Sequence, residues 1–402
     1  IRRNNLDKIK DISPDLIGFS VYTQDYQYTL EFARMIKKEI DTPIIFGGIH
    51  CILCPEQVIK EDCVDMVCVS EGEEEIVKLA NRLSNRYDNC FNIWSKLDGK
   101  VWKRRPMLPL IQNLDSLPFI DRDILYEQKP VFKKDISILT GRGCPYSCAF
   151  CASDALNRQH RDNNLGKVVR QRSVGNVIIE LKVVQIKYKP RSIYFTDDVF
   201  TMNTNWLREF SYIYRNTINL PFYCTANPGT IKDEELHLLK QAGCQMIGFG
   251  MQSCNEEYRK NVLKRYGSNE RIKEVAKLCH KLRIHFSFDH IFNLPNEPIE
   301  NQKEALKFYK ETRPDIINTF NMTYLPKIEL NKYLDDKTRE EVEKGNIRTT
   351  MFNKQSKLLF WIQLIKKDIK RLMIGRYSDV FFPIRLLLAN IKDNILIKCG
   401  LR

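Results

Sequence analysis

The chain has 402 residues, 43% of them hydrophobic, and a formal net charge of +14. This length predicts two or three domains, and the hydrophobic fraction excludes a wholly disordered chain. No apolar run reaches the roughly 20 residues that a membrane-spanning helix needs. Lysines scattered along the whole chain carry much of the charge, which favours solvated helix faces, so we do not expect nucleic acid as a partner.

The start of the chain and its cysteine content indicate the cellular compartment in which the protein is expected. The chain opens at Ile1 inside a charged stretch without a signal-like segment, and we expect a further segment upstream. Thirteen cysteines without a secretory signal predict a reducing, cytoplasmic environment, in which thiols serve as ligands or as core residues.

Residues 1–95 alternate buried strands with amphipathic helices. Strands are predicted at Leu16–Val21, Pro43–Phe46 and Val64–Val69, with a helix over Tyr28–Ile40 whose apolar residues recur at helical spacing. A further helix follows the third strand. Strand and helix alternation of this length predicts a partial Rossmann-like parallel sheet.

A linker rich in proline and charge is predicted over 96–134. A second alternating block covers 135–330 and predicts a (β/α)6 partial TIM barrel, in which ligands gather where strands end and loops begin. Its six predicted strands are Ile136–Thr140, Ser192–Thr196, Phe222–Thr225, Met246–Gly250, His285–Ile291 and Ile316–Met322.

Residues 331–402 form a predicted basic helical C-terminal extension. Leu358–Ile374 and Phe381–Ile397 mix apolar residues with lysine and arginine. We favour packing of these helices onto the barrel. The alternative is peripheral contact with an anionic membrane surface, at the inner membrane face.

Three cysteines, Cys144, Cys148 and Cys151, follow the first predicted barrel strand at spacings of three and then two residues. A structural zinc site needs a fourth ligand, and iron–sulfur clusters normally take four thiolates. Three thiolates without a fourth therefore predict a cluster with one open iron. Gly141 and Gly143 give the loop the freedom to wrap around such a cluster.

With Phe150 before the last cysteine, this loop resembles the signature of the radical S-adenosylmethionine (radical SAM) superfamily. The resemblance covers Asp135 to about Pro326. It implies that the three cysteines hold a [4Fe-4S] cluster, whose fourth iron chelates the amino and carboxylate groups of SAM. It further implies reductive cleavage of SAM to a 5′-deoxyadenosyl radical, with an electron donor such as flavodoxin or ferredoxin.

The resemblance also implies residues that bind SAM. Asp197 or Asp198, after the second strand, would contact the ammonium group, although the two could instead cap a helix. Gln252 and Ser253, after the fourth strand, would lie near the ribose; relatives commonly have Glu where this chain has Gln252.

The end of the fifth strand departs from the family pattern. Asn293 and Asn296 replace two glycines, and because Asn tolerates positive φ, we expect the turn to survive. His290 is interpreted as a barrel-wall residue, with a substrate contact as the alternative. Cys254 is a weaker candidate for a hydrogen donor near the site.

The first segment resembles the cobalamin-binding domain found in one branch of this superfamily. The resemblance includes Ser20, Thr23, Gly47 and Gly48, followed by an acidic motif at Glu71–Glu73. It implies that the strand-end hydroxyls and the Gly-Gly turn border the nucleotide tail of cobalamin. Some domains of this kind supply a cobalt-binding histidine from an Asp-x-His-x-x-Gly loop after their first strand. No such sequence exists here, and we expect that loop to lie upstream of Ile1, which would make this a truncated cobalamin domain.

Other candidate ligands carry less weight. His50 follows the two glycines and is not assigned as the cobalt ligand. Cys51 and Cys54 form a single Cys-x2-Cys pair, interpreted as core residues rather than a redox or metal site.

These features predict a cobalamin-dependent radical SAM enzyme, most simply one that transfers a methyl group to an unactivated carbon. Ring closure or rearrangement with the same cofactors is one alternative, and an RNA-modifying radical SAM enzyme with a degenerate first domain is another. A cluster-bearing scaffold without catalysis is the third. The expected substrate is a small or lipid-like molecule that the sequence does not name.

Overall fold

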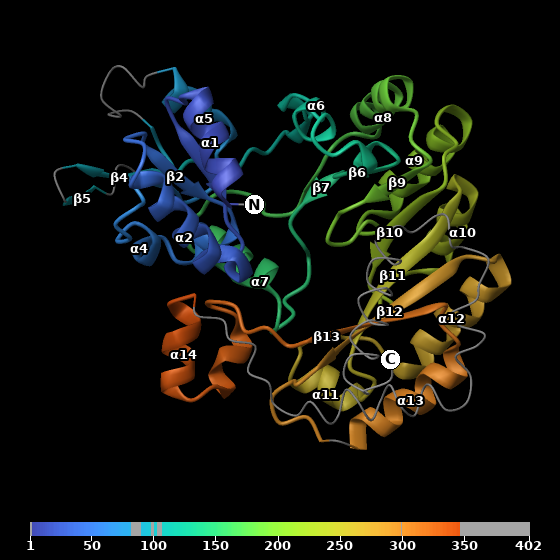
Figure 1. Ribbon diagram of the computed structural model, residues 1–402. Helices are drawn as coiled ribbons and strands as arrows, with labels where there is room; N and C mark the ends of the chain where they lie inside the picture. The colour runs from blue at the N-terminus through green and yellow to red at the C-terminus, as the bar shows by residue number, and fades with distance from the viewer. Residues whose placement is uncertain (1, 82–89, 98–99, 103–106, 299, 346–402) are drawn as a thin grey trace, which may run out of the picture.

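Two sheets, each with helices beside it, organise the chain (Figure 1). Within the described residues, no helix is both long and apolar enough to cross a bilayer. The computed structural model describes all residues except 1, 82–89, 98–99, 103–106, 299 and 346–402.

The first sheet has the order β1-β2-β3-β4-β5. Its parallel part is β1 (Ile17–Ser20), β2 (Ile44–Gly47) and β3 (Met66–Cys68), which confirms the predicted Rossmann-like sheet. Two antiparallel strands, β4 (Ile93–Leu97) and β5 (Lys100–Trp102), continue it into the stretch predicted as a linker.

Helix α2 shows why this layer forms. It spans Tyr26–Lys37, and its residues Leu30, Ala33 and Ile36 are buried against the sheet. Full burial of a Leu or Ile side chain contributes about 1.5–3 kcal/mol. The other helices of this domain are α1 (Arg2–Ile12), α3 (Ile49–Leu53), α4 (Pro55–Val58) and α5 (Glu73–Ala80).

The second sheet contains six parallel strands whose order across the sheet equals their order along the chain. Its two edges are the first and last strands, so it is an open, partial barrel, and all six predicted strands are confirmed. They are β6 (Asp135–Ile138), β9 (Ser192–Phe195), β10 (Phe222–Ala226), β11 (Cys244–Gln252), β12 (His285–Phe292) and β13 (Ile316–Asn321).

Alternation along the strands assigns their side chains to two faces. On β9, Ile193 and Phe195 belong to the core shared with the helices, so Tyr194 between them faces the opposite, inner side. The helices of this core are α8 (Val174–Tyr188), α9 (Thr204–Thr217), α10 (Asp233–Ala242), α12 (Asn269–Leu282) and α13 (Glu300–Thr312).

Two helix ends match their sequence signals. Helix α10 ends at Gly243, whose φ of 102° is the left-handed value that glycine adopts without strain. Helix α12 starts after Ser268, whose side chain accepts a hydrogen bond from Arg271 N.

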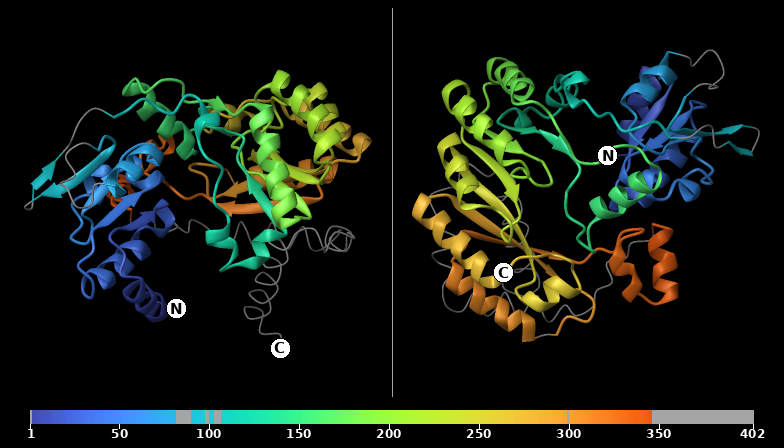
Figure 2. Two further views of the ribbon diagram at one scale, coloured as in Figure 1. Left: turned by 90° about the horizontal axis from the view of Figure 1, so that it is seen from above. Right: turned by 180° about the vertical axis from the view of Figure 1, so that it is seen from behind.

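Segments from two later parts of the chain lie against the first domain (Figures 1 and 2). Helix α7 (Ala152–Asp162) follows the cysteine loop, and Gln159 Nε2 donates to Ile52 O at 2.8 Å. Helix α14 (Asp336–Glu343) lies below the first domain in Figure 1, and Gln27 Nε2 of α2 donates to Lys344 O, the residue after α14, at 3.4 Å. The predicted basic helices that follow it lie outside the described residues, so their packing or membrane contact stays a prediction.

Candidate active site

The cysteine loop is opened by a short antiparallel ribbon, in which β7 (Gly141–Arg142) pairs with β8 (Arg170–Gln171). Gly143 follows with a φ of 83°, and a Cβ there would lie 2.3 Å from Val168 O, so only glycine fits. From α7, the helix that follows the loop, Asn157 donates to Cys144 O at 2.7 Å. The start of the loop is therefore held both by the ribbon and by α7.

The three thiols share one environment. Cys148 is 5% exposed, Cys144 and Cys151 are half-buried, and none forms a disulfide. Burial, together with the charges of Asp198 and the other two cysteines, raises the pKa of the Cys144 thiol to about 12. The Cys151 thiol likewise has its pKa raised by burial and by the charge of Cys148.

The donor set fits an iron–sulfur cluster better than a single ion. In the described part of the chain, no group of three or more Cys, His, Asp or Glu residues could hold a single metal ion. In a [4Fe-4S] cluster each thiolate binds a different iron, so the ligands need not converge on one point. Three free thiols in one loop meet that requirement and leave the fourth iron without a protein thiolate.

Arg265 lies beside the cysteines, and the sequence analysis did not identify it. Its Nη1 is 3.5 Å from Cys148 Sγ, and its Nε donates to Gly250 O at 2.6 Å. A Cβ at Gly250 would lie 2.8 Å from Arg265 Nη2, so the glycine makes room for the guanidinium. A guanidinium in this place is a ready partner for a carboxylate.

The two aspartates after β9 have different surroundings. Asp197 is 3% exposed and accepts hydrogen bonds from Thr140 N and, at 2.7 Å, from Thr140 Oγ1. Burial raises the pKa of Asp197 to about 6, while these hydrogen bonds oppose that rise. Asp198 is exposed and accepts from Ser153 Oγ at 3.0 Å, beside the cysteine loop. Asp197 thus anchors a strand end, and Asp198 is the carboxylate open to a ligand.

Gln252 and Ser253 end β11 at a bulge. Gln252 has a φ of 68°, which is strained for a residue other than glycine. Ser253 Oγ donates to Glu297 Oε1 at 2.6 Å and accepts from Asn255 N at 3.3 Å. Because its one proton is committed to Glu297, Ser253 can act only as an acceptor toward a ligand hydroxyl.

A chain of buried polar groups continues from Ser253. Gln302 Nε2 donates to Glu297 Oε2 at 2.9 Å, and Gln302 Oε1 lies 2.9 Å from His290 Nε2. Tyr309 OH lies 2.8 Å from His290 Nδ1. Burial raises the pKa of Glu297 to about 7 and lowers that of His290 to about 4. His290 is fully buried against α13, the surroundings of a barrel-wall residue.

The predicted asparagine turn and Phe150 are also described. Asn293 and Asn296 have φ values of 62° and 56°, which confirms that both adopt the left-handed conformation expected where relatives have glycine. Phe150 packs against a cluster that includes Leu53 of the first domain and Leu294 of the barrel. It therefore joins the two domains behind the cysteine loop.

A pocket of about 560 Å³ lies at the carboxyl ends of the parallel strands in the first sheet. Ser20, Gly47 and Gly48, all predicted from the sequence, line it. Two further lining groups, Ser70 Oγ and Glu73 Oε2, are buried and lack a hydrogen-bond partner among the described residues. Cobalamin carries many amide N–H donors, so these unpaired acceptors fit it.

The backbone requires glycine at position 48 but not at position 47. Gly48 has a φ of 95°, and a Cβ there would lie 2.7 Å from Val21 N, so the backbone requires glycine. A Cβ at Gly47 would meet only Cys68 Cβ, at an ordinary 3.5 Å. Gly47 is therefore not required by the fold but leaves the pocket wall bare.

Thr23 and His50 lie outside the pocket lining. They are 2% and 0% exposed, and Thr23 Oγ1 is 3.2 Å from His50 Nδ1. Burial lowers the pKa of His50 to about 4, so the ring is neutral. Neither Cys51 nor Cys54 forms a disulfide, and burial raises the pKa of Cys54 to about 12, which keeps that thiol protonated.

Two protein-family profiles match the chain. The radical SAM superfamily profile covers residues 138–309, and the B12 binding domain profile covers residues 4–80. Fold and site together define a radical SAM protein with a cobalamin-binding domain ahead of its barrel. Residues 138–309 are therefore a radical SAM domain and residues 4–80 a B12-binding domain, a combination whose cofactors are a [4Fe-4S] cluster, SAM and cobalamin.

Curated relatives include an uncharacterized methyltransferase of Pyrococcus horikoshii, 28% identical over 81% of this chain and 70% of its own length. The anaerobic magnesium-protoporphyrin IX monomethyl ester cyclase of Rubrivivax gelatinosus is 27% identical, over 85% of this chain. The chain spans only 62% of that cyclase.

Solved structures share the fold. The radical SAM methyltransferase TsrM from Kitasatospora setae has a TM-score of 0.65 at 18% identity, over 82% of this chain and 66% of its own. The cobalamin-dependent radical SAM enzyme OxsB has a TM-score of 0.69 at 18% identity, over 90% of this chain and 59% of its own.

Proposed function

We propose that the chain is a cobalamin-dependent radical SAM enzyme that transfers a methyl group to an unactivated carbon of a small molecule. The observation that carries the proposal is the pairing of two sites in one chain. A loop of three free thiols lies at the strand ends of the barrel, and an acceptor-lined pocket lies at the strand ends of the first sheet. Methyltransferases among the relatives support methyl transfer over other outcomes.

Different residues of the barrel would hold the cluster and bind the separate groups of SAM. Cys144, Cys148 and Cys151 would hold the cluster, which supplies the electron for SAM cleavage, while cobalamin carries the methyl group. Asp198 is the exposed carboxylate beside the loop and suits the ammonium group of SAM.

Two further groups suit the rest of SAM. The Arg265 guanidinium, 3.5 Å from Cys148 Sγ, is suited to the carboxylate. Ser253, whose proton is held by Glu297, accepts from a ribose hydroxyl, with the Gln252 amide beside it.

The substrate would lie on the inner face of the barrel. Tyr194 and Tyr223 stack there with ring centroids 4.5 Å apart, and Phe320 is 51% exposed. Asn318 Nδ2 donates to Asp289 Oδ1 at 2.9 Å. Aromatic faces beside one carboxylate suit a small molecule with a planar apolar body and a hydrogen-bond donor.

We propose flavodoxin or ferredoxin as the electron donor.

Anaerobic reconstitution tests the proposal directly. The purified chain should take up about four irons and four sulfides per chain, the content of a [4Fe-4S] cluster. With a reductant it should release 5′-deoxyadenosine from SAM, and hydroxocobalamin should bind with a shifted absorbance spectrum. A chain that bound neither cluster nor SAM would disprove the proposal.

Ring closure is the second candidate, because the Rubrivivax gelatinosus relative is a cyclase. The two reactions differ in product mass. Methyl transfer adds one CH2 to the substrate, whereas ring closure adds no carbon. Transfer of label from methyl-labelled SAM to the product distinguishes them.

A further inference from the structure

Two acidic residues of the first domain form ion pairs with the ribbon that opens the cysteine loop. Arg142 contacts Glu71 Oε1 at 2.8 Å through Nη1 and Glu73 Oε1 at 2.5 Å through Nη2. Arg170, the partner of Arg142 across the ribbon, contacts Glu71 Oε2 at 2.9 Å. Ile111 N donates to the same Glu71 oxygen at 2.8 Å. Both carboxylates are therefore engaged by the barrel side.

The ion pair between Glu71 and Arg170 is sheltered from solvent, whereas the side chains of Arg142 and Glu73 are 28% and 37% exposed. The side chains of Glu71 and Arg170 are 15% and 6% exposed. Burial alone would raise the pKa of Glu71, but hydrogen bonds from Arg170 and Arg142 lower it, so the carboxylate stays ionised. Loss of one partner would leave this sheltered carboxylate with fewer compensating groups, which costs more than loss of a surface pair.

The two ends of this ion-pair cluster reach different cofactor sites. Glu71 and Glu73 line the pocket of the first domain. Arg142 lies two residues before Cys144, separated only by Gly143. Glu73 is the direct connection, because Oε1 binds Arg142 while Oε2 is buried and has no hydrogen-bond partner in the described part of the chain.

We propose that Arg142 is a positioning residue that couples occupancy of the first-domain pocket to the order of the cysteine loop. A ligand N–H that donates to Glu73 Oε2 fixes this carboxylate, and the carboxylate fixes the Arg142 guanidinium. The first residues of the cysteine loop then lose freedom before SAM binds, so SAM binding orders less. By thermodynamic reciprocity, SAM must tighten cobalamin binding by the same factor. The inference rests on the proposed function.

A titration measures this coupling without turnover. Hydroxocobalamin is titrated by absorbance into the cluster-loaded chain, with and without saturating SAM and in the absence of reductant. SAM should lower the cobalamin Kd of the unaltered chain by about ten-fold, within the range typical of coupled sites. In Arg142→Gln the Kd should change by less than about two-fold. Arg142→Lys should fall between them, since one ammonium cannot bridge two carboxylates as a planar guanidinium does.

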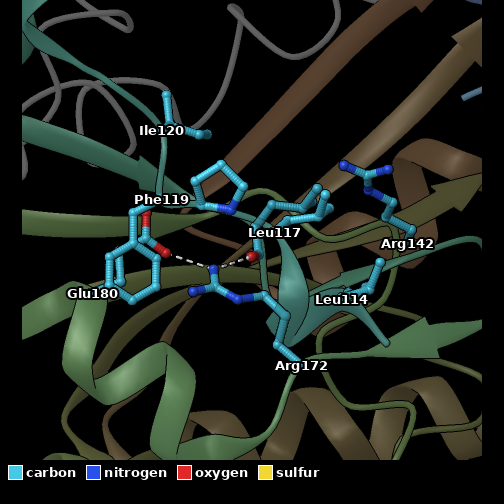
Figure 3. Close-up of a pocket in the computed structure, with 10 residues that line it drawn as sticks. Leu114, Leu117, Phe119, Ile120, Arg142, Arg172 and Glu180 are labelled. Atoms are coloured by element: carbon cyan, nitrogen blue, oxygen red, sulfur yellow. Dashed lines mark hydrogen bonds and ion pairs between the residues drawn. The ribbon is translucent and has the colours of Figure 1, made fainter. Parts of the chain in front are cut away.

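Arg172 provides the matched control. It contacts Glu180 Oε2 at 2.5 Å and donates to Leu139 O at 3.0 Å, both within the barrel. Figure 3 shows this pair at one side of a small pocket and Arg142 at the other. Arg172→Gln also removes a sheltered arginine near the ribbon, but it should retain the full effect of SAM on the cobalamin Kd.

The outcomes separate the inference from the proposed function. A chain that binds neither cluster nor cobalamin overturns both. A chain that binds both, but whose cobalamin Kd ignores SAM, overturns the coupling alone, as does full coupling in Arg142→Gln. If Arg142→Gln does not fold, Glu73→Gln decides: loss of coupling supports the inference, and full coupling overturns it.

Discussion

The two cofactor sites lie at equivalent places, the carboxyl ends of parallel strands, but they are built differently. In the first domain, glycines leave the pocket wall bare, and only a few acceptors such as Ser70 and Glu73 line it. In the barrel, side chains with fixed partners surround the cysteine loop, among them Asp197 and Arg265. A large ligand with many amides needs space and acceptors, whereas a small zwitterion needs charges at set positions. The same strand-end geometry therefore serves both through different residue types.

The largest difference between the sites should appear when a cysteine is removed from each domain. Cys148→Ala should abolish iron incorporation and SAM cleavage, because a cluster cannot be held by the two remaining thiolates. Cys54→Ala removes a thiol that is also buried, at 7% exposure, but lies in the first domain. It should retain a full cluster by iron analysis and electron paramagnetic resonance. Equal iron content in the two variants would contradict the assignment of the loop.

Alanine substitutions at the two glycines of the first domain should separate an effect on stability from an effect on cobalamin binding. Gly48→Ala must hold a φ of 95° and a ψ of −179°, a conformation that costs other residues about 1–3 kcal/mol, and its Cβ would lie 2.7 Å from Val21 N. Its melting temperature should fall clearly. Gly47→Ala should melt like the unaltered chain and bind cobalamin about ten-fold more weakly, the effect of ~1.4 kcal/mol. A lowered melting temperature for Gly47→Ala would show that the fold requires this glycine too.

The neighbouring aspartates of the barrel should likewise separate a structural residue from a ligand-binding one. Asp197→Asn replaces a buried acceptor of Thr140 by an amide, and should cost about 1–3 kcal/mol of unfolding free energy. Asp198→Asn lies at an exposed position. It should leave the denaturation midpoint unchanged and weaken SAM binding, as measured by equilibrium dialysis. Equal loss of stability in both variants would mean that both carboxylates are structural.

Much of the fold followed from local pattern. The six barrel strands could be predicted because short apolar runs alternate with segments whose apolar residues recur at helical spacing. Each of these patterns depends only on residues close together in the sequence. The turn with Asn293 and Asn296 was predicted because the tolerance of Asn for positive φ belongs to the residue itself. Element bounds were less accurate, and α2 begins at Tyr26 rather than Tyr28, since its first turn joins a short 3-10 helix.

The contacts that could not be predicted from the sequence join residues far apart along the chain. Arg142 and Glu71 are 71 positions apart, and Arg265 and Cys148 are 117 apart. No spacing rule connects such pairs, because the fold decides which loops meet. Nor could the sequence separate Asp197 from Asp198, since the difference is which carboxylate faces inward at the strand end. Gly250 gave a hint of this contact, because a glycine within a strand leaves room for a side chain from another part of the chain.

A last comparison, which depends on pH, concerns Glu297, the carboxylate that accepts the hydrogen bond from Ser253. Burial raises its pKa to about 7, well above the value near 4.3 expected in the unfolded chain. Between these two values the folded state binds more protons than the unfolded state, so this group lowers stability as pH rises, and the loss is complete above about pH 7. Glu297→Gln removes that contribution. Its urea midpoint, relative to the unaltered chain, should therefore be higher at pH 8 than at pH 5. A midpoint difference independent of pH would show that Glu297 is not held in a raised-pKa state, and that the Ser253 contact is an ordinary ionised one.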